Sequence, residues 1–118
     1  MLIDQKINYL ELPADDLDAV EKFYAGAFGW KFTPYGPEYR AFSDGTMDGG
    51  FFKSSKRSSS TASGAALIVL YADDLEATEQ TVLNHGGTVL RPIFPFPGGR
   101  RFHFADPHGN ELAVWSEN

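Results

Sequence analysis

Hydrophobic and polar residues alternate with a period of two on both sides of residues 106–110. Phe102 and Phe104 share one parity before this segment, and Leu112 and Val114 share one after it. The opposite parity carries a different set: Arg101, His103, Ala105, Glu111, Ala113 and Trp115. Residues 106–110 read Asp-Pro-His-Gly-Asn, which favours a tight turn. The pattern predicts a hairpin with one face on a core and the other face offered to a ligand or partner.

Two other segments have apolar residues at helical spacing. The first stripe consists of Leu17, Val20, Phe23, Tyr24, Ala27 and Phe28, and the second of Leu75, Val82 and Leu83. An Asp-Asp pair precedes each stripe, at residues 15–16 and 73–74, and glycine follows each, at residue 29 and at residues 86–87. Aspartate caps helix N-termini and glycine ends helices, so both segments are predicted to be helices.

Short strands are predicted at residues 7–12, 30–32, 39–43, 47–53, 65–71 and 88–90, ahead of the closing hairpin. Residues 92–99, rich in Pro, Phe and Gly, are expected to form a connection. Residues 54–64 (SSKRSSSTASG) are too polar to pack and are expected to form a mobile linker.

The chain contains an internal repeat, because Ala-Asp-Asp-Leu at residues 14–17 recurs at residues 72–75. Each half reads strand, helix and three strands, and neither half alone can bury both its helix and its sheet face. We therefore expect one α+β domain over residues 1–118, with repeats 1–53 and 65–118 joined by the linker 54–64. The two half-sheets are expected to curve around a common cleft with the helices outside. Strand parity directs these residues into it: Tyr9, Glu11, Leu67, Val69, Arg101, His103, Glu111 and Ala113.

Composition narrows the classes of function. The chain has 118 residues, no cysteine and a formal net charge of −6. Without cysteine there is no disulfide, thiolate nucleophile or Cys-based metal site, and the negative charge argues against nucleic acid and anionic membrane surfaces as partners. No basic leader with an apolar run opens the sequence, and no apolar run approaches the ~20 residues of a membrane span. A cytoplasmic location is expected.

The repeated strand-helix-three-strand unit resembles the vicinal oxygen chelate superfamily, which includes glyoxalase I, bleomycin- and fosfomycin-resistance proteins and extradiol dioxygenases. The resemblance spans nearly the whole chain and is to the single-domain, glyoxalase-like members. It rests on these segments: Leu12-Pro13-Ala14-Asp15-Asp16-Leu17, Phe23-Tyr24, Phe28-Gly29-Trp30, Gly86-Gly87 and Phe104-Ala105-Asp106-Pro107-His108-Gly109-Asn110.

The resemblance also implies where a divalent metal would be held. Its metal-dependent members use His, Gln or Glu side chains from equivalent strands of the two halves. Those positions fall here on Tyr9, Leu67, Ala113 and, with an uncertain register, Gly49. Leu, Ala and Gly offer no side-chain ligand, and Tyr is a poor one for such ions. We therefore expect no metal at these positions and no cofactor.

Other residues of the cleft parity carry chemistry. His103, Glu11 and Glu111 form a candidate set for an alternative metal site or for acid–base catalysis; the alternative is that the glutamates pair with Arg101 or solvent. Arg101 is a candidate anchor for a carboxylate or phosphonate. An aromatic wall of Tyr9, Trp30, Tyr39 and Trp115 could contact a planar ligand, together with Leu67 and Val69, although core packing is the alternative for each aromatic residue.

We therefore expect a glyoxalase/bleomycin-resistance-like protein that binds a small organic ligand without the usual metal. The resemblance implies a homodimer. Two alternatives stay open. One is an atypical lyase, isomerase or dioxygenase-like enzyme, akin to lactoylglutathione lyase, that uses His103, Glu11 and Glu111. The other is a protein-interaction module that presents the aromatic face.

Overall fold

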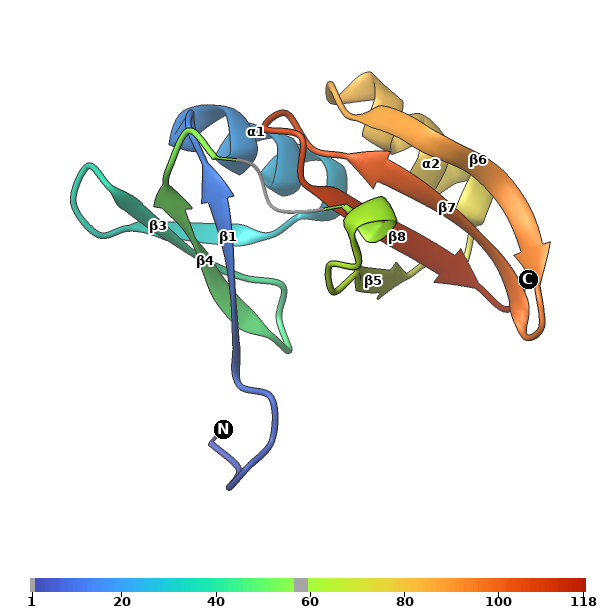
Figure 1. Cartoon of the computed structure of the whole chain (residues 1–118), viewed down its shortest axis with the longest axis horizontal. Coiled ribbons are helices and arrows are strands. Elements are labelled where there is room, and N and C mark those ends of the chain that lie inside the picture. Colours follow the sequence, from blue (N-terminus) through green and yellow to red (C-terminus); the bar gives the residue numbers. More distant parts are fainter. Residues whose placement is uncertain (1, 57–59) are drawn as a thin grey trace.

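The structure is a computed structural model that describes residues 2–56 and 60–118, and it consists of two four-stranded sheets and two α-helices (Figure 1). The first half contains β1 (Tyr9–Ala14), α1 (Leu17–Phe28), β2 (Lys31–Pro34), β3 (Tyr39–Ser43) and β4 (Asp48–Lys53). The short 3-10 helix η1 (Thr61–Ser63) follows. The second half contains β5 (Ile68–Tyr71), α2 (Leu75–Asn84), β6 (Thr88–Phe96), β7 (Gly99–Ala105) and β8 (Glu111–Ser116).

The two sheets have the same topology. Their strand orders are β1-β4-β3-β2 and β5-β8-β7-β6. The pairs β1–β4 and β5–β8 are parallel, and the other neighbouring strands are antiparallel. The predicted α+β fold of two strand-helix-three-strand units is therefore confirmed.

The helices begin and end largely where the sequence predicts. The side chain of Asp16 accepts a hydrogen bond from the backbone N–H of Ala19 at 3.1 Å, and Asp74 caps α2 in the same way through Ala77 at 3.0 Å. Gly29 follows α1 with a φ of 73°, a left-handed conformation that glycine adopts without steric cost. The repeated Asp-Asp-Leu motif thus starts a helix in each half.

One continuous hydrophobic core joins the halves. Helix α1 contributes to both sheets, since Phe23 packs against Phe104 of β7 with ring centroids 5.9 Å apart and Tyr24 packs against Phe51 of β4 at 5.4 Å. The predicted core residues of the closing hairpin, Phe102, Phe104, Leu112 and Val114, are fully buried. Because α1 occupies the inner faces of both sheets, the opposite faces lie outside this core.

A buried polar network also connects the halves. Asp106, in the β7–β8 turn, accepts hydrogen bonds on Oδ2 from the Tyr24 hydroxyl at 2.9 Å and from Nδ2 of Asn110 at 3.0 Å. The same Nδ2 donates to the carbonyl oxygen of Pro13 in β1 at 2.9 Å. The turn therefore also ties β1 and α1 to the second sheet.

Several predicted boundaries are wrong. Strand β1 begins at Tyr9 rather than at Ile7, whose side chain is 80% exposed. Strand β6 continues through most of the predicted 92–99 connection, with register irregularities between Val89 and Phe94. Prolines are accepted on β6 because it is an edge strand with an irregular register, where a residue without an N–H is tolerated.

The predicted linker is partly ordered by specific contacts. The backbone N–H of Ser54 donates to the Ala14 carbonyl at 3.1 Å, and Thr61–Ser63 form η1. Residues 57–59 of the predicted linker lie outside the described residues.

Candidate functional site on the open sheet faces

His103 and Glu111 form a hydrogen-bonded pair on the open face of the second sheet. Nδ1 of His103 lies 2.7 Å from Oε2 of Glu111, and the two side chains are only 1% and 8% exposed. Their strands are neighbours, with His103 opposite Ala113 and Ala105 opposite Glu111. An ionised carboxylate only accepts, so Nδ1 carries the proton of this bond and Nε2 of a neutral imidazole holds a lone pair.

The far side of the Glu111 carboxylate is held by the segment that joins the halves. The backbone N–H of Thr61 donates to Oε1 at 2.9 Å, and the Thr61 hydroxyl lies 3.0 Å from Oε2. Burial raises the pKa of Glu111, but the hydrogen bonds from His103 and Thr61 outweigh burial and leave the pKa below its ordinary value. Glu111 is therefore a carboxylate that orients the imidazole.

One nitrogen of the pair has no partner within the described part of the chain. Nε2 of His103 is buried and makes no hydrogen bond among residues 2–56 and 60–118. The ring of Phe94, from β6, lies against the imidazole at 5.8 Å. Buried polar atoms in proteins nearly always have a partner, so this one marks a candidate contact for a ligand.

Arg101 lies on the same open face, two residues before His103 along β7. Its guanidinium lies 5.5 Å from the ring centroid of Phe94 and 5.7 Å from that of Phe96. Its Nε is buried without a partner, and within the described part of the chain no carboxylate lies within ion-pair distance. A shallow surface depression of about 220 Å³ adjoins it and is lined by Val69, Phe96, Arg101 and Trp115.

A second polar cluster lies on the open face of the first sheet. The hydroxyls of Tyr9 and Tyr39 are 2.7 Å apart, and Tyr39 donates to Oε2 of Glu11 at 2.8 Å. Gly50 makes room for this arrangement, because a Cβ there would lie 2.0 Å from the Tyr39 oxygen. Partial burial, and then the hydrogen bonds with Tyr9 and Glu11, raise the pKa of Tyr39.

The structure does not bring the predicted set of Glu11, His103 and Glu111 together. Glu11 lies on β1 and bonds to Tyr39, whereas the other two residues lie on the second sheet. Among the described residues, no three His, Asp or Glu side chains gather closely enough to hold a metal ion. The candidate residues therefore divide between the two sheets, with Glu11 on the first and with His103 and Glu111 on the second.

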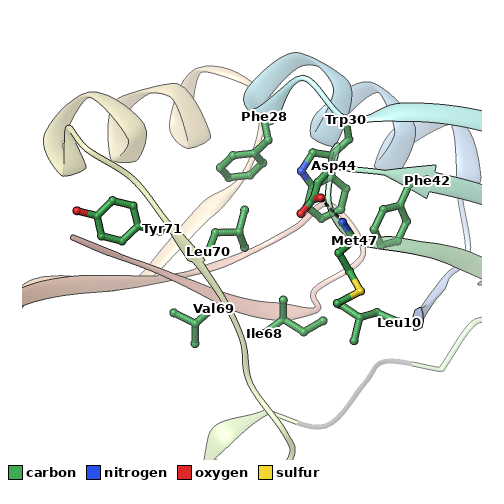
Figure 2. Close-up of a pocket in the computed structure, with 10 residues that line it drawn as sticks. All are labelled: Leu10, Phe28, Trp30, Phe42, Asp44, Met47, Ile68, Val69, Leu70 and Tyr71. Atoms are coloured by element: carbon green, nitrogen blue, oxygen red, sulfur yellow. Dashed lines mark hydrogen bonds between the residues drawn. The ribbon is translucent and has the colours of Figure 1, made fainter. Parts of the chain in front are cut away.

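A larger groove of about 430 Å³ lies between the halves, and its lining is mostly apolar (Figure 2). Leu10, Met47 and Ile68 lie around it, and Asp44, its one acidic residue, accepts a hydrogen bond from the backbone N–H of Met47 at 2.7 Å. Trp30 also lines it.

Trp30 packs in the core, which is the alternative given above to a shared aromatic wall with Trp115. Its ring is stacked between Tyr24 and Phe42, each with its centroid 4.5 Å away, and it is 7% exposed. Trp30 precedes β2 and turns to the core face. Of the other predicted wall residues, Tyr9 and Tyr39 lie on the first sheet and Trp115 on the second.

The positions that the resemblance assigns to a metal do not fit one. Ala113 is fully buried opposite His103, and Leu67 lies just before β5. Gly49 is on the core face, where a Cβ would meet the Phe42 ring at 2.3 Å, so the glycine of the open face is Gly50. Without imidazole or carboxylate groups at these positions, the donor set is unsuited to a divalent ion.

Three residues of the site were not predicted. Thr61 falls in the low-complexity segment, where nothing in the sequence distinguishes it from its neighbours. Phe94 and Phe96 fall in the segment expected to be a connection. Their period-two spacing was a usable strand signal, but Pro92 and Pro95 obscured it.

Comparisons with known proteins identify the family. The family model for the Glyoxalase/Bleomycin resistance protein/Dioxygenase superfamily matches residues 6–114. The chain therefore belongs to this superfamily.

Similar proteins carry related names. A glyoxylase-like domain-containing protein of Didymella fabae is 31% identical, over 97% of this chain and 95% of its own length. A putative glyoxylase of Mycobacterium bovis is 27% identical over 94% of this chain, which spans only 45% of that protein. The solved structure of a lactoylglutathione lyase from Agrobacterium tumefaciens is 25% identical, with a TM-score of 0.70 and coverage of 95% of this chain and 93% of that one.

Proposed function

We propose that this protein binds a small organic molecule on the open face of the second sheet, without a metal at the positions that the resemblance assigns. The observation that carries the proposal is the buried Nε2 of His103, which has no hydrogen-bond partner among the described residues. A polar ligand atom would satisfy it, and the neighbouring Arg101 supplies a positive charge with no carboxylate partner in the described chain.

We also propose that the functional unit is a homodimer, as the resemblance implies. Among the described residues, strands β1 and β5 each pair with one other strand, so each half has an unpaired sheet edge there. Pairing with a second copy would cover such edges. It would also allow the tyrosine cluster of one chain to approach the His103 face of the other. Sedimentation equilibrium tests this: a single species of one-chain mass at micromolar concentration would contradict it.

Acid–base catalysis is the second candidate, and the 2.7 Å contact between His103 and Glu111 favours it. A carboxylate that fixes the Nδ1 proton leaves Nε2 as a base, able to take a proton from a bound substrate. In this function His103 would be the proton acceptor and Glu111 the residue that positions it.

Nuclear magnetic resonance tests the binding proposal directly. A library of single-ring organic compounds is added to the ¹⁵N-labelled protein, and we expect resonance shifts clustered around Arg101, His103 and Glu111. Replacing His103 by glutamine should weaken the shifts, whereas the same change at His85, at the end of α2, should not. Shifts confined to other surfaces, or none with any compound, would overturn the proposal.

Two further measurements separate the alternatives. If the wild-type protein converts a compound and the His103→Gln variant does not, acid–base catalysis is favoured over a function in binding alone. Elemental analysis of the untagged protein, purified without chelator, should find no stoichiometric metal. About one divalent ion per chain would overturn the metal-free part of the proposal.

A further inference from the structure

The open face of the second sheet concentrates positive charge in an acidic protein. The net charge of the chain is −6, yet Arg91 and Arg101 both lie near Phe94, with guanidinium carbons 4.1 and 5.5 Å from its ring centroid. Neither has an ion-pair partner among residues 2–56 and 60–118, whereas Arg40 and Arg100 each pair with a carboxylate. Two unpaired cations on one face favour an anionic ligand.

The shape of the Arg101 group limits the anion. A guanidinium is planar and presents two parallel N–H bonds, which match the two oxygens of a carboxylate. Its buried Nε has no hydrogen-bond acceptor among the described residues, so one N–H of that fork is left without a protein partner there. A carboxylate bound side-on would supply the missing acceptor.

The remainder of the ligand would lie in the adjoining surface depression. Its volume of about 220 Å³ is small beside drug-sized sites of roughly 300–1,000 Å³, so its lining can contact a single ring. Trp115 forms one wall and is held edge-to-face by Phe96 at 6.0 Å and by Tyr71 at 5.0 Å. Val69, itself 43% exposed, completes an apolar lining that favours an aromatic ring.

We infer that the ligand is a single-ring aromatic carboxylate, with its carboxylate on Arg101 and its ring against Trp115 and Phe96. This inference rests on the proposed binding function and names its ligand class.

Benzoate and its neutral analogue benzamide test the inference, with tryptophan fluorescence as the signal. The chain has two tryptophans, so the Trp30→Phe variant reports on Trp115 alone. Benzoate should change this fluorescence saturably, and benzamide should bind at least about 10-fold more weakly. Arg101→Gln should weaken benzoate binding by about 10- to 100-fold, as expected for a lost hydrogen bond to a charged group. The benzoate affinity of Arg101→Lys should lie between those of the wild type and Arg101→Gln, because lysine keeps the charge but lacks the two parallel N–H donors.

The neighbouring arginine provides the matched control. Arg100 donates to Glu76 from the other face of β7, so Arg100→Gln should leave benzoate binding unchanged. In the unmodified protein, the Trp115 indole N–H resonance should shift with benzoate, which guards against a fold change caused by the Trp30 substitution. Circular dichroism confirms that each variant is folded.

The outcomes separate this inference from the binding function. Equal binding of benzoate and benzamide, or no effect of Arg101→Gln, would overturn the carboxylate assignment and leave the binding function standing. If benzoate does not bind while neutral library compounds do, the carboxylate assignment is likewise overturned and the binding function stands. If no library compound and neither probe binds, both are overturned.

Discussion

Replacing Asp106 by alanine would test whether the turn of the closing hairpin holds the two halves together. The Tyr24 hydroxyl is fully buried and donates to the Asp106 carboxylate at 2.9 Å. Burial, and then the charge and hydrogen bond of Asp106, raise the pKa of Tyr24 well above its ordinary value, so the hydroxyl stays a donor. Without the carboxylate, this donor is left in the core.

The magnitude follows from the kind of hydrogen bond. A bond to a charged group contributes about 1.5–3 kcal/mol, and a buried donor left unsatisfied costs about 1–3 kcal/mol. Asp106→Ala should therefore be strongly destabilising in the wild-type background and less so when Tyr24 is already phenylalanine. We expect a coupling free energy of about 1.5–3 kcal/mol between the two substitutions.

Urea unfolding, followed by circular dichroism at one fixed protein concentration, measures the four free energies of unfolding of this cycle. Tyr35→Phe is the matched control, because the Tyr35 side chain lies at the surface, 66% exposed. Its effect should add to that of Asp106→Ala. A coupling below about 0.5 kcal/mol between Tyr24 and Asp106 would be ordinary additivity and would refute the proposed link.

Two further predictions concern the open faces. The pKa of Glu111 is lower in the folded chain than its unfolded value of about 4.3, so its ionised form stabilises the fold above that pH, and this contribution is lost as pH falls through the folded pKa. The stability difference between wild type and Glu111→Gln should therefore be constant above about pH 5 and shrink in acid; a difference that grows in acid would contradict this. Gly50→Ala should displace the Tyr39 ring, which lies 2.0–2.6 Å from the new Cβ, and destabilise the protein by about 1–3 kcal/mol in urea unfolding. Gly45→Ala is the control, because its new Cβ meets open space while its φ of 104° still imposes backbone strain. An unchanged environment of Tyr39 in the Gly50→Ala variant would contradict the predicted collision.

The fold was largely predictable because local signals agree with one another. The Asp-Asp-Leu repeat, the glycine after α1 and the alternation around residues 106–110 each specify an element, and their recurrence specifies two equivalent halves. The limits of β6 were not predictable in this way, because prolines that usually end a strand are accepted on a bulged edge.

The site was only partly predictable, for a geometric reason. Strand parity places a side chain on one face of its own sheet, and it did so for His103, Glu111 and Arg101. Parity does not say how two sheets face each other. That relation depends on long-range packing, such as that of α1 through Phe23 on Phe104 of β7 and through Tyr24 on Phe51 of β4, which has no local signal in the sequence. Glu11 and His103 share a parity, but Glu11 bonds to Tyr39 in the first sheet and His103 bonds to Glu111 in the second.

The position of the carboxylate on β8 shows how this framework can carry other chemistry. The resemblance places an acidic ligand at residue 113, where this chain has a fully buried alanine directly opposite His103. Glu111 of this chain lies two residues earlier, on the same face of β8 but nearer the turn, and it accepts a hydrogen bond from Thr61. There the carboxylate orients an imidazole, and the small Ala113 leaves space for that ring. The acidic group of β8 therefore lies two residues from the position that the resemblance assigns to a metal ligand, and it is hydrogen-bonded to His103.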